Sequence, residues 1–186
     1  MTIVRPTPDD TLDDVARPQV GVRHALVPSP LGELTVCAEG DALTGVYFEG
    51  HRHPPTPRRL GARVAVGDDP VLAAAQAQLV DYFGGERTVF ELVLAPVGEP
   101  FQLRVWRRLR AIPYGERTTY GAIAREFGDP HLARAVGAAV GRNPLSIVVP
   151  CHRVVGSTGS LTGFAGGLDR KARLLDLEAA DSLFAL

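Results

Sequence analysis

Three short apolar runs separated by two turns open the ordered part of the chain. The runs lie at 22–27, 33–39 and 42–49, and the turn sequences between them are Pro-Leu-Gly at 30–32 and Gly-Asp at 40–41. Short apolar runs joined by turns rich in Gly, Pro and Asp are typical of paired strands. The pattern therefore predicts an antiparallel meander.

A helix follows the meander. The proline-rich segment 51–61 is predicted to be a loop. Asp69 followed by Pro70 is a helix start signal, apolar residues then recur at helical spacing through Phe83, and Gly84-Gly85 ends the pattern. The run 90–96 predicts a further strand.

After Pro100 the apolar residues recur at helical rather than strand spacing. Thr118 or Thr119 can cap the second of the helices, and Asp129-Pro130 can open the third. The predicted elements are helices over 101–112, 119–127 and 130–141, a buried strand over 146–150, a glycine-rich loop over 156–167 and a last helix over 169–180.

These elements predict an α/β (α+β) fold in two domains. Residues 1–20 lack periodicity and are expected to form a mobile tail. Residues 21–98 are expected to form a small antiparallel sheet with a helix. Residues 99–186 are expected to form a mainly helical domain with a winged-helix-like helix-turn-helix.

Composition excludes several classes of protein. The chain has 186 residues, of which 45% are hydrophobic and 22% are charged, as in an ordinary globular protein and unlike a disordered chain or a collagen. No apolar run is long enough to cross a bilayer, and the start of the chain lacks the apolar core of a secretory signal. Two cysteines in such a chain predict free thiols in a reducing compartment.

The charge is distributed unevenly along the chain. Residues 101–153 carry nine arginines against three acidic residues, a net charge of +6, whereas the remainder carries 11 basic and 18 acidic residues, a net charge of −7. This asymmetry indicates an anionic partner for the second half. The alternative is an arginine-rich composition with solvated helix faces.

The third helix of the second half has unusually little side-chain bulk. Ala and Gly occupy most of 133–139, and Arg134 is the one long cation among them. A helix of this kind can lie very close to another surface, and against DNA only Arg134 is long enough to enter the base stack. The alternative is a helix packed tightly on its neighbours, with Arg134 in solvent.

Cys151 lies in the sequence Pro-Cys-His-Arg, between an apolar run and a glycine-rich loop. A thiol reacts as thiolate, which a base such as His152 and a cation such as Arg153 favour. Because adjacent side chains seldom face each other, a link between Cys151 and His152 requires a tight turn or a bridging water. The alternative is a buried, inert thiol. The imidazole needs an acceptor for its second N–H, and the last helix offers Asp169, Asp176 and Glu178.

The other thiol and the paired histidines carry less information. Cys37 lies in the middle of a predicted strand and is interpreted as a packing residue. His51 and His53 lack further ligands at metal-binding spacing, and the chain has no nucleotide-binding or zincin motif.

The run from Phe101 to Glu178 resembles the O6-alkylguanine-DNA alkyltransferases, the methylated-DNA–protein-cysteine methyltransferases. The segment 29–36 also resembles the N-terminal domain of that family, so that the resemblance covers nearly all of the chain outside the tail. The motifs that carry it are Pro-Tyr-Gly-Glu at 113–116, Thr-Tyr at 119–120, Ala-Arg-Ala-Val-Gly at 133–137, Asn-Pro at 143–144, Pro-Cys-His-Arg-Val-Val at 150–155, Gly-Gly-Leu at 166–168, Leu-Leu at 174–175 and Glu178.

The resemblance implies catalytic roles for five residues. Cys151 would accept the alkyl group as a thiolate, His152 would activate it through a water, and Glu178 would orient His152. Asn143 would brace the active-site turn against the recognition helix. Tyr120 would donate a proton or hydrogen bond to N3 of the guanine as it leaves.

The resemblance also implies a DNA-binding surface. Arg134 would enter the duplex from the minor groove while the damaged nucleotide rotates out. Ala133, Ala135 and Gly137 would let the helix approach, and Thr119 is included among the residues that contact DNA.

The substrate-base pocket is expected to involve Val154, Phe164 and Ala165. The carbonyls of Cys151 and Val154 would bind the guanine amino group, and the N–H of residue 165 would bind O6. Family members often carry Tyr-Ser where this chain has Phe164-Ala165, so the hydroxyl contacts are lost. The N-terminal zinc cysteines of some relatives are missing, and neither a metal nor a cofactor is expected.

The implied function is the repair of double-stranded DNA that contains O6-alkylguanine. Because a thioether is a poor leaving group, one turnover per molecule is expected. The resemblance implies a monomer in the cytoplasm with no membrane association, and it leaves open whether molecules bind DNA cooperatively. The alternatives are a non-catalytic sensor of alkylation damage, a helix-turn-helix regulator and a cysteine hydrolase, which would turn over repeatedly.

Overall fold

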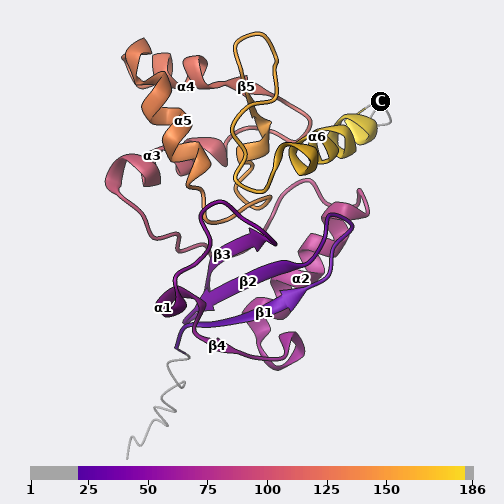
Figure 1. Ribbon diagram of the computed structural model, residues 1–186. Coiled ribbons are helices and arrows are strands. Elements are labelled where there is room, and N and C mark those ends of the chain that lie inside the picture. The colour runs from indigo at the N-terminus through magenta and orange to yellow at the C-terminus, as the bar shows by residue number, and fades with distance from the viewer. Residues whose placement is uncertain (1–20, 183–186) are drawn as a thin grey trace, which may run out of the picture.

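The computed structural model describes residues 21–182, so the predicted mobile tail lies outside the described part (Figure 1). The N-terminal half contains a four-stranded sheet in the order β3-β2-β1-β4. The first three strands pair antiparallel, as the meander predicts, and β4 adds a short parallel edge that was not predicted. The strands are β1 Arg23–Val27, β2 Leu34–Glu39, β3 Ala42–Phe48 and β4 Ala62–Arg63.

The predicted helix is α2, Pro70–Phe83, and it lies across one face of this sheet (Figure 1). The Asp69 carboxylate caps it by accepting from the N–H groups of Val71 and Leu72 at 3.0 and 2.9 Å. Asp69 also pairs with buried Arg23 of β1, which fixes the start of the helix to the sheet. The apolar core between sheet and helix contains Leu34, Val36 and Ala38 of β2 and Leu72, Ala75 and Leu79 of α2.

Two expectations for the N-terminal half were wrong. The segment predicted as a loop over 51–61 contains a short helix, α1 Pro57–Leu60, and a 3-10 turn, η1 Val66–Asp68, follows it. The run 90–96 forms a single bridge between Leu43 and Leu94 rather than a strand. It stops there because Pro96 has no N–H with which to continue a ladder.

The C-terminal half is mainly helical, as expected. Thr119 caps α4 by accepting from the N–H of Ala122 at 3.1 Å, and α4 and α5 form the predicted helix-turn-helix (Figure 1). A short parallel pair, β5 with β6, was not predicted. The elements are α3 Pro100–Leu109, β5 Thr118–Thr119, α4 Tyr120–Glu126, η2 Pro130–Leu132, α5 Ala133–Gly141, η3 Cys151–Arg153, β6 Val154–Val155 and α6 Leu168–Ser182.

The strand predicted over 146–150 is replaced by two three-residue turns. The N–H of Val148 donates to the carbonyl of Ser146 at 2.9 Å, with Ile147 between them at a φ of 72°. The N–H of Cys151 donates to the carbonyl of Val149 at 2.7 Å, around Pro150. The segment is as buried as a strand would be, which is why its apolar pattern misled the prediction.

Strand β3 forms backbone hydrogen bonds with the chain at residues 144–146, where this segment begins. The N–H of Val46 donates to the carbonyl of Pro144 at 2.8 Å, and the N–H of Ser146 donates to the carbonyl of Val46 at 3.0 Å. The pairing is a parallel bridge between Val46 and Leu145. The edge of the N-terminal sheet thus contacts the backbone that leads to Cys151.

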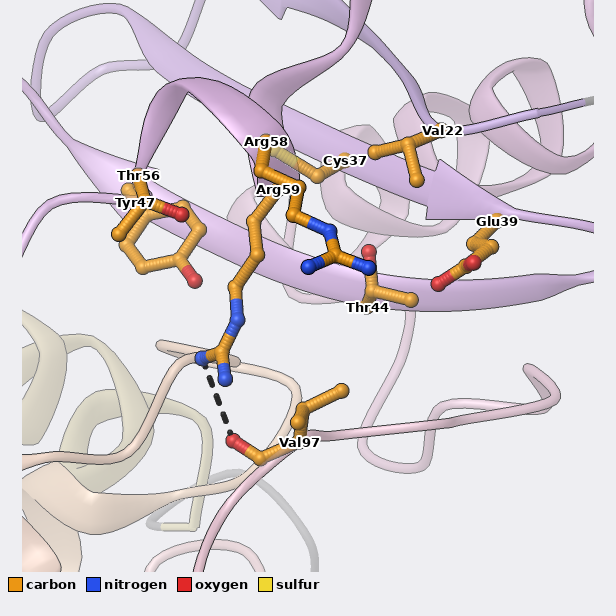
Figure 2. Close-up of a pocket in the computed structure, with 9 residues that line it drawn as sticks. All are labelled: Val22, Cys37, Glu39, Thr44, Tyr47, Thr56, Arg58, Arg59 and Val97. Atoms are coloured by element: carbon orange, nitrogen blue, oxygen red, sulfur yellow. Dashed lines mark hydrogen bonds between the residues drawn. The ribbon is translucent and has the colours of Figure 1, made fainter.

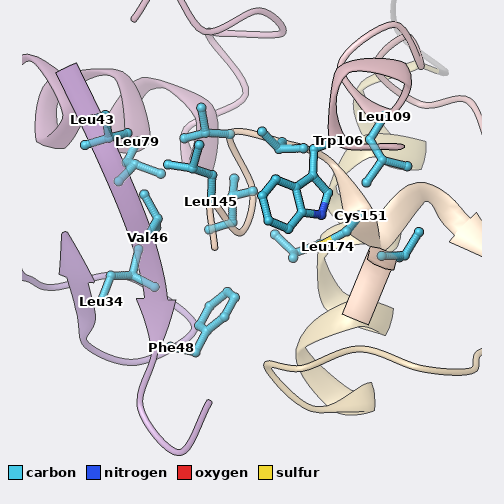
Figure 3. Packing of buried hydrophobic residues seen from close by; sticks show 14 of the residues in the cluster. Leu34, Leu43, Val46, Phe48, Leu79, Trp106, Leu109, Leu145, Cys151 and Leu174 are labelled. Atoms are coloured by element: carbon cyan, nitrogen blue, oxygen red, sulfur yellow. The ribbon is translucent and has the colours of Figure 1, made fainter. Parts of the chain in front are cut away.

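One apolar cluster runs through both halves. Figure 3 shows Leu145 between the residues of the sheet and the ring of Trp106, with Cys151 and Leu174 next to that ring. The indole N–H of Trp106 donates to the carbonyl of Ala139 in α5 at 2.8 Å. No helix of residues 21–182 is long and apolar enough to cross a membrane.

Ile147 provides a test of backbone strain before the cysteine. A β-branched residue at positive φ is disfavoured by about 1–2 kcal/mol, and glycine avoids this cost. Both Ile147→Gly and Ile147→Ala lose the buried side chain, but we expect the glycine variant to be at least as stable as the alanine variant. At Val148, which has negative φ, glycine should be less stable than alanine by about 0.5–1 kcal/mol. Denaturant unfolding of the four variants measures both differences, and the same order at both positions would contradict the assigned strain.

Candidate active site

Cys151 begins the 3-10 turn η3 and is buried, with 4% of its surface exposed. Burial raises the pKa of its thiol, and this effect outweighs the lowering by the Asn143 side chain and by the charge of Lys171. The thiol is therefore protonated at neutral pH and needs a base to become a nucleophile. Any molecule that reacts with the thiol must reach into the protein, because the sulfur does not lie on the surface.

Asn143 holds the two turns that precede Cys151. Its side-chain nitrogen donates to the carbonyl of Val149 at 2.8 Å, and its side-chain oxygen accepts from the N–H of Leu145 at 3.1 Å. The side chain is 1% exposed, so both contacts are made in a dry environment. Asn143 thus binds both ends of the segment 145–149, whose ends are also joined by the hydrogen bond from the N–H of Val149 to the carbonyl of Leu145 at 2.8 Å.

His152 is fully buried behind Cys151. Its Nε2 lies 2.8 Å from Oε1 of Glu178, the acceptor among the three acidic candidates that the structure brings to it. Because Glu178 is an ionised acceptor, Nε2 carries the proton of the neutral ring, and Nδ1 keeps a free lone pair. Within the described residues, Nδ1 of His152 is buried and has no hydrogen-bond partner. The histidine thus has one free basic nitrogen.

The Glu178 carboxylate is bound by several donors at once. Arg153 donates from Nη2 to Oε1 at 2.8 Å and from Nε to Oε2 at 2.9 Å, and the N–H of Gly115 donates to Oε2 at 3.2 Å. The hydroxyl of Tyr82 donates to Oε1 at 2.8 Å. Burial alone would raise the pKa of Glu178, but the hydrogen bonds from His152 and Arg153 lower it to about 2. The carboxylate therefore stays ionised inside the protein.

His152 itself is held neutral. Burial lowers the pKa of the imidazole, the Glu178 carboxylate opposes this effect, and the charges of Arg153 and Lys171 add to it. A neutral imidazole with a free nitrogen, on the residue that follows the thiol in the chain, is a group that can accept a proton.

Tyr120 and Lys171 form the other side of the site. The Tyr120 hydroxyl donates to the carbonyl of Thr162 at 2.8 Å, and burial raises its pKa. The Lys171 ammonium is fully buried and donates to the carbonyls of Val154 and Thr162 at 2.5 and 2.6 Å, and burial lowers its pKa to about 8. Lys171 thus joins the strand after the cysteine to the glycine-rich loop.

Two of the predicted pocket residues, Phe164 and Ala165, contact the end of β3 and the segment that follows it, whereas Val154 pairs with β5. Phe164 contacts Phe48 of β3 edge to face, with ring centroids 6.0 Å apart. The carbonyl of Ala165 accepts from the N–H of Arg52 at 2.9 Å. The carbonyl of Val154 accepts from Lys171, which leaves it one further lone pair.

Four of the predicted DNA-binding residues lie in the first five positions of α5, and the fifth, Thr119, caps α4. Arg134 and Ala135 are exposed, Ala133 and Gly137 are half-buried, and the intervening Val136 is buried in the core. Gly137 lies beside the ring of Tyr120, because a Cβ placed on it would be 3.6 Å from that ring. Tyr120 thus contacts both α5, at Gly137, and the glycine-rich loop, at the carbonyl of Thr162.

The second cysteine lies elsewhere. Cys37 lines a hollow of about 340 Å³ on the sheet, together with Tyr47 and the arginines of α1 (Figure 2). Burial raises the pKa of its thiol to about 12, so it remains protonated and unreactive. No cluster of three or more His, Cys, Asp or Glu side chains in residues 21–182 is placed to hold a metal ion.

Three residues of this site were not predicted from the sequence. Arg153 was considered only as a source of positive potential, and Tyr82 and Lys171 were not considered at all. Arg153 and Lys171 carry charges at low exposure, 6% and 0%, which sequence patterns do not reveal. The one available signal was that Lys171 is the sole lysine of an arginine-rich chain.

Two family models match the chain. Residues 22–96 match the ribonuclease-like domain of 6-O-methylguanine DNA methyltransferase, and residues 100–180 match its DNA-binding domain.

Curated relatives and solved structures agree with this match. The methylated-DNA–protein-cysteine methyltransferase of Mycolicibacterium paratuberculosis is 46% identical over 87% of this chain and 94% of its own. The constitutive enzyme of that name from Bacillus subtilis is 43% identical over 83% of this chain and 94% of its own. The crystal structure of Mycobacterium tuberculosis OGT in complex with DNA superposes with a TM-score of 0.78 at 42% identity, covering 86% of this chain and 94% of that chain. The chain therefore belongs to the 6-O-methylguanine DNA methyltransferase family.

Proposed function

We propose that this protein repairs O6-alkylguanine in double-stranded DNA by transferring the alkyl group to its own Cys151. The observation that carries the proposal is the buried thiol followed in sequence by His152, whose Nδ1 is free and whose Nε2 is held by Glu178. Membership of the family and the DNA-bound relative support the substrate. The protein would act as a monomer in the cytoplasm, on chromosomal DNA.

In the proposed reaction, His152 removes the proton of Cys151. Because the two residues are adjacent in the chain, the proton passes through a bridging water to Nδ1, and Glu178 stabilises the imidazolium that forms. The positive charge of Lys171 favours the thiolate. The sulfur then attacks the alkyl carbon, so that an S–C bond forms while the bond between carbon and O6 breaks.

The electron pair of the broken bond remains on the guanine, which leaves as an anion. Tyr120 would turn its hydroxyl from the carbonyl of Thr162 to N3 of the base and donate a hydrogen bond or proton there. The carbonyls of Cys151 and Val154 would accept from the amino group of the base. Because the product thioether is stable, the protein would act once.

DNA would be bound through α5. The exposed start of this helix carries small residues around Arg134, so the helix can approach the minor groove closely. Extruding a nucleotide costs about a few kcal/mol, and an Arg134 side chain in the vacated place would offset part of this cost. Thr119 at the start of α4 would contact the backbone.

The alternatives fit less well. A non-catalytic sensor has no use for a thiol with a neighbouring base. A helix-turn-helix regulator needs long polar side chains on the recognition helix to read the major groove, and α5 is nearly all Ala and Gly.

The acceptor can be identified by mass spectrometry. We expect incubation with a duplex that contains O6-methylguanine to add one methyl group to the peptide with Cys151, and Cys151→Ala to abolish the transfer. The matched control is Cys37→Ala, which removes the inert thiol and should leave transfer intact. Methylation of another residue, or repair by Cys151→Ala, would refute the assignment.

The role of Arg134 can be separated from the chemistry. We expect Arg134→Ala to slow repair of duplex DNA by about tenfold or more, equivalent to about 1.4 kcal/mol of lost stabilisation, and to leave the reaction with free O6-methylguanine nearly unchanged. Single-turnover rates with both substrates measure the difference. Arg63→Ala removes an exposed arginine from β4 and should affect neither rate. Equal losses with both substrates in Arg134→Ala would exclude the intrusion role.

A further inference from the structure

The N-terminal half contributes one side chain to the hydrogen bonds of Glu178. Tyr82, in the last turn of α2, is fully buried, and its hydroxyl donates to Oε1 of Glu178 at 2.8 Å. The same oxygen lies 2.8 Å from Nε2 of His152. A residue 96 positions away in the sequence therefore binds the atom that orients the histidine.

The direction of this hydroxyl is fixed by its surroundings. The Tyr82 ring packs against Phe83, Phe90 and Tyr114, with centroids 5.4, 5.5 and 6.0 Å away. Burial and the neighbouring Glu178 raise the pKa of Tyr82, so the hydroxyl keeps its proton and acts as a donor. The aromatic cluster thus aims a permanent donor at the carboxylate.

The charged groups around this donor come from α6 and η3, and one further titratable group, Tyr114, comes from the turn after α3. Glu178 of α6 interacts with His152 and Arg153 of η3. The charge of Lys171, also on α6, lowers the pKa of His152. Tyr114, in the turn after α3, faces the ring of Tyr82. Tyr82 is an uncharged donor to the Glu178 carboxylate, so removing its hydroxyl changes the hydrogen bonding without changing any charge.

We propose that Tyr82 is a positioning residue for the transfer reaction, because its hydroxyl fixes the Glu178 carboxylate that holds His152 with Nδ1 free for the proton of Cys151. The inference rests on the proposed function. Through Tyr82, α2 of the N-terminal half contributes a side chain to the hydrogen bonds of the active site.

The consequence is a pH effect with a defined sign. A hydrogen bond from Tyr82 takes up part of the negative charge of Oε1. Without it, more of that charge acts on His152, which favours the imidazolium and raises its pKa. The free base is then lost at a higher pH, so the acidic limb of the transfer rate moves upward.

Tyr82→Phe removes the hydroxyl and keeps the ring. We expect the pH at which the single-turnover rate falls to half on the acidic side to rise by about 0.5 to 1 unit. At higher pH the rate should return to the wild-type value, and the Kd for the same duplex should not change. NMR titration of the His152 imidazole in the protein without DNA should show a shift of the same sign. This second measurement does not depend on repair.

Tyr47→Phe is the matched control. Tyr47 is also buried in the N-terminal half, but its side chain lines the hollow of Figure 2, whose lining includes none of the site residues. Both variants should lose some stability on heating, while only Tyr82→Phe should move the pH limb. An unshifted His152 titration in Tyr82→Phe, or the same shift in Tyr47→Phe, would overturn the proposal. Failure of the wild-type protein to accept methyl groups would instead contradict the proposed function, and the titration would still decide the role of Tyr82.

Discussion

The buried carboxylate of Glu178 is the contact on which the rest of the site depends. A lone charge at 1% exposure would be strongly unfavourable, and only a complete set of donors makes it tolerable. Those donors come from α2, the turn after α3 and η3, and the carboxylate itself lies on α6. Segments distant in the sequence must therefore assemble before the charge is compensated.

This requirement explains why the backbone before Cys151 is irregular. A regular strand would direct successive side chains to opposite faces and could not place residues 151 to 153 in a tight turn. The strained turn at Ile147 and the hydrogen bonds of the Asn143 side chain instead bend the chain before the 3-10 turn. From that turn, His152 and Arg153 both contact Glu178. Local strain is thus compensated by the hydrogen bonds that it makes possible.

Local signals predicted most of the fold. The meander, α2 and the helix-turn-helix each have a turn or capping signal within a few residues, such as Asp69 before Pro70 and Thr119 before α4. The bridges of Leu43 with Leu94 and of Val46 with Leu145 have no such signal, because they pair residues far apart in the chain. The buried run before Cys151 was mistaken for a strand because burial alone produces the same apolar pattern.

Only those residues of the site that belong to a recognisable sequence motif were predicted. Cys151, His152 and Glu178 were selected from the sequence, and the structure brings the last two into contact. Tyr82 and Lys171 were missed because their partners are a carboxylate and two carbonyls brought close only by folding. A tyrosine at helical spacing and a lysine in an amphipathic helix are ordinary features until their burial is known.

The bridge between β3 and the segment that leads to Cys151 has a consequence for protein engineering. The two matched regions look like interchangeable modules, but the edge of the sheet pairs with residues 144 to 146 in one register. A chimera that joins this C-terminal region to another N-terminal region would need an edge strand of the same length and offset. Recombination between distant relatives is thereby limited by hydrogen-bond geometry rather than by the composition of either part.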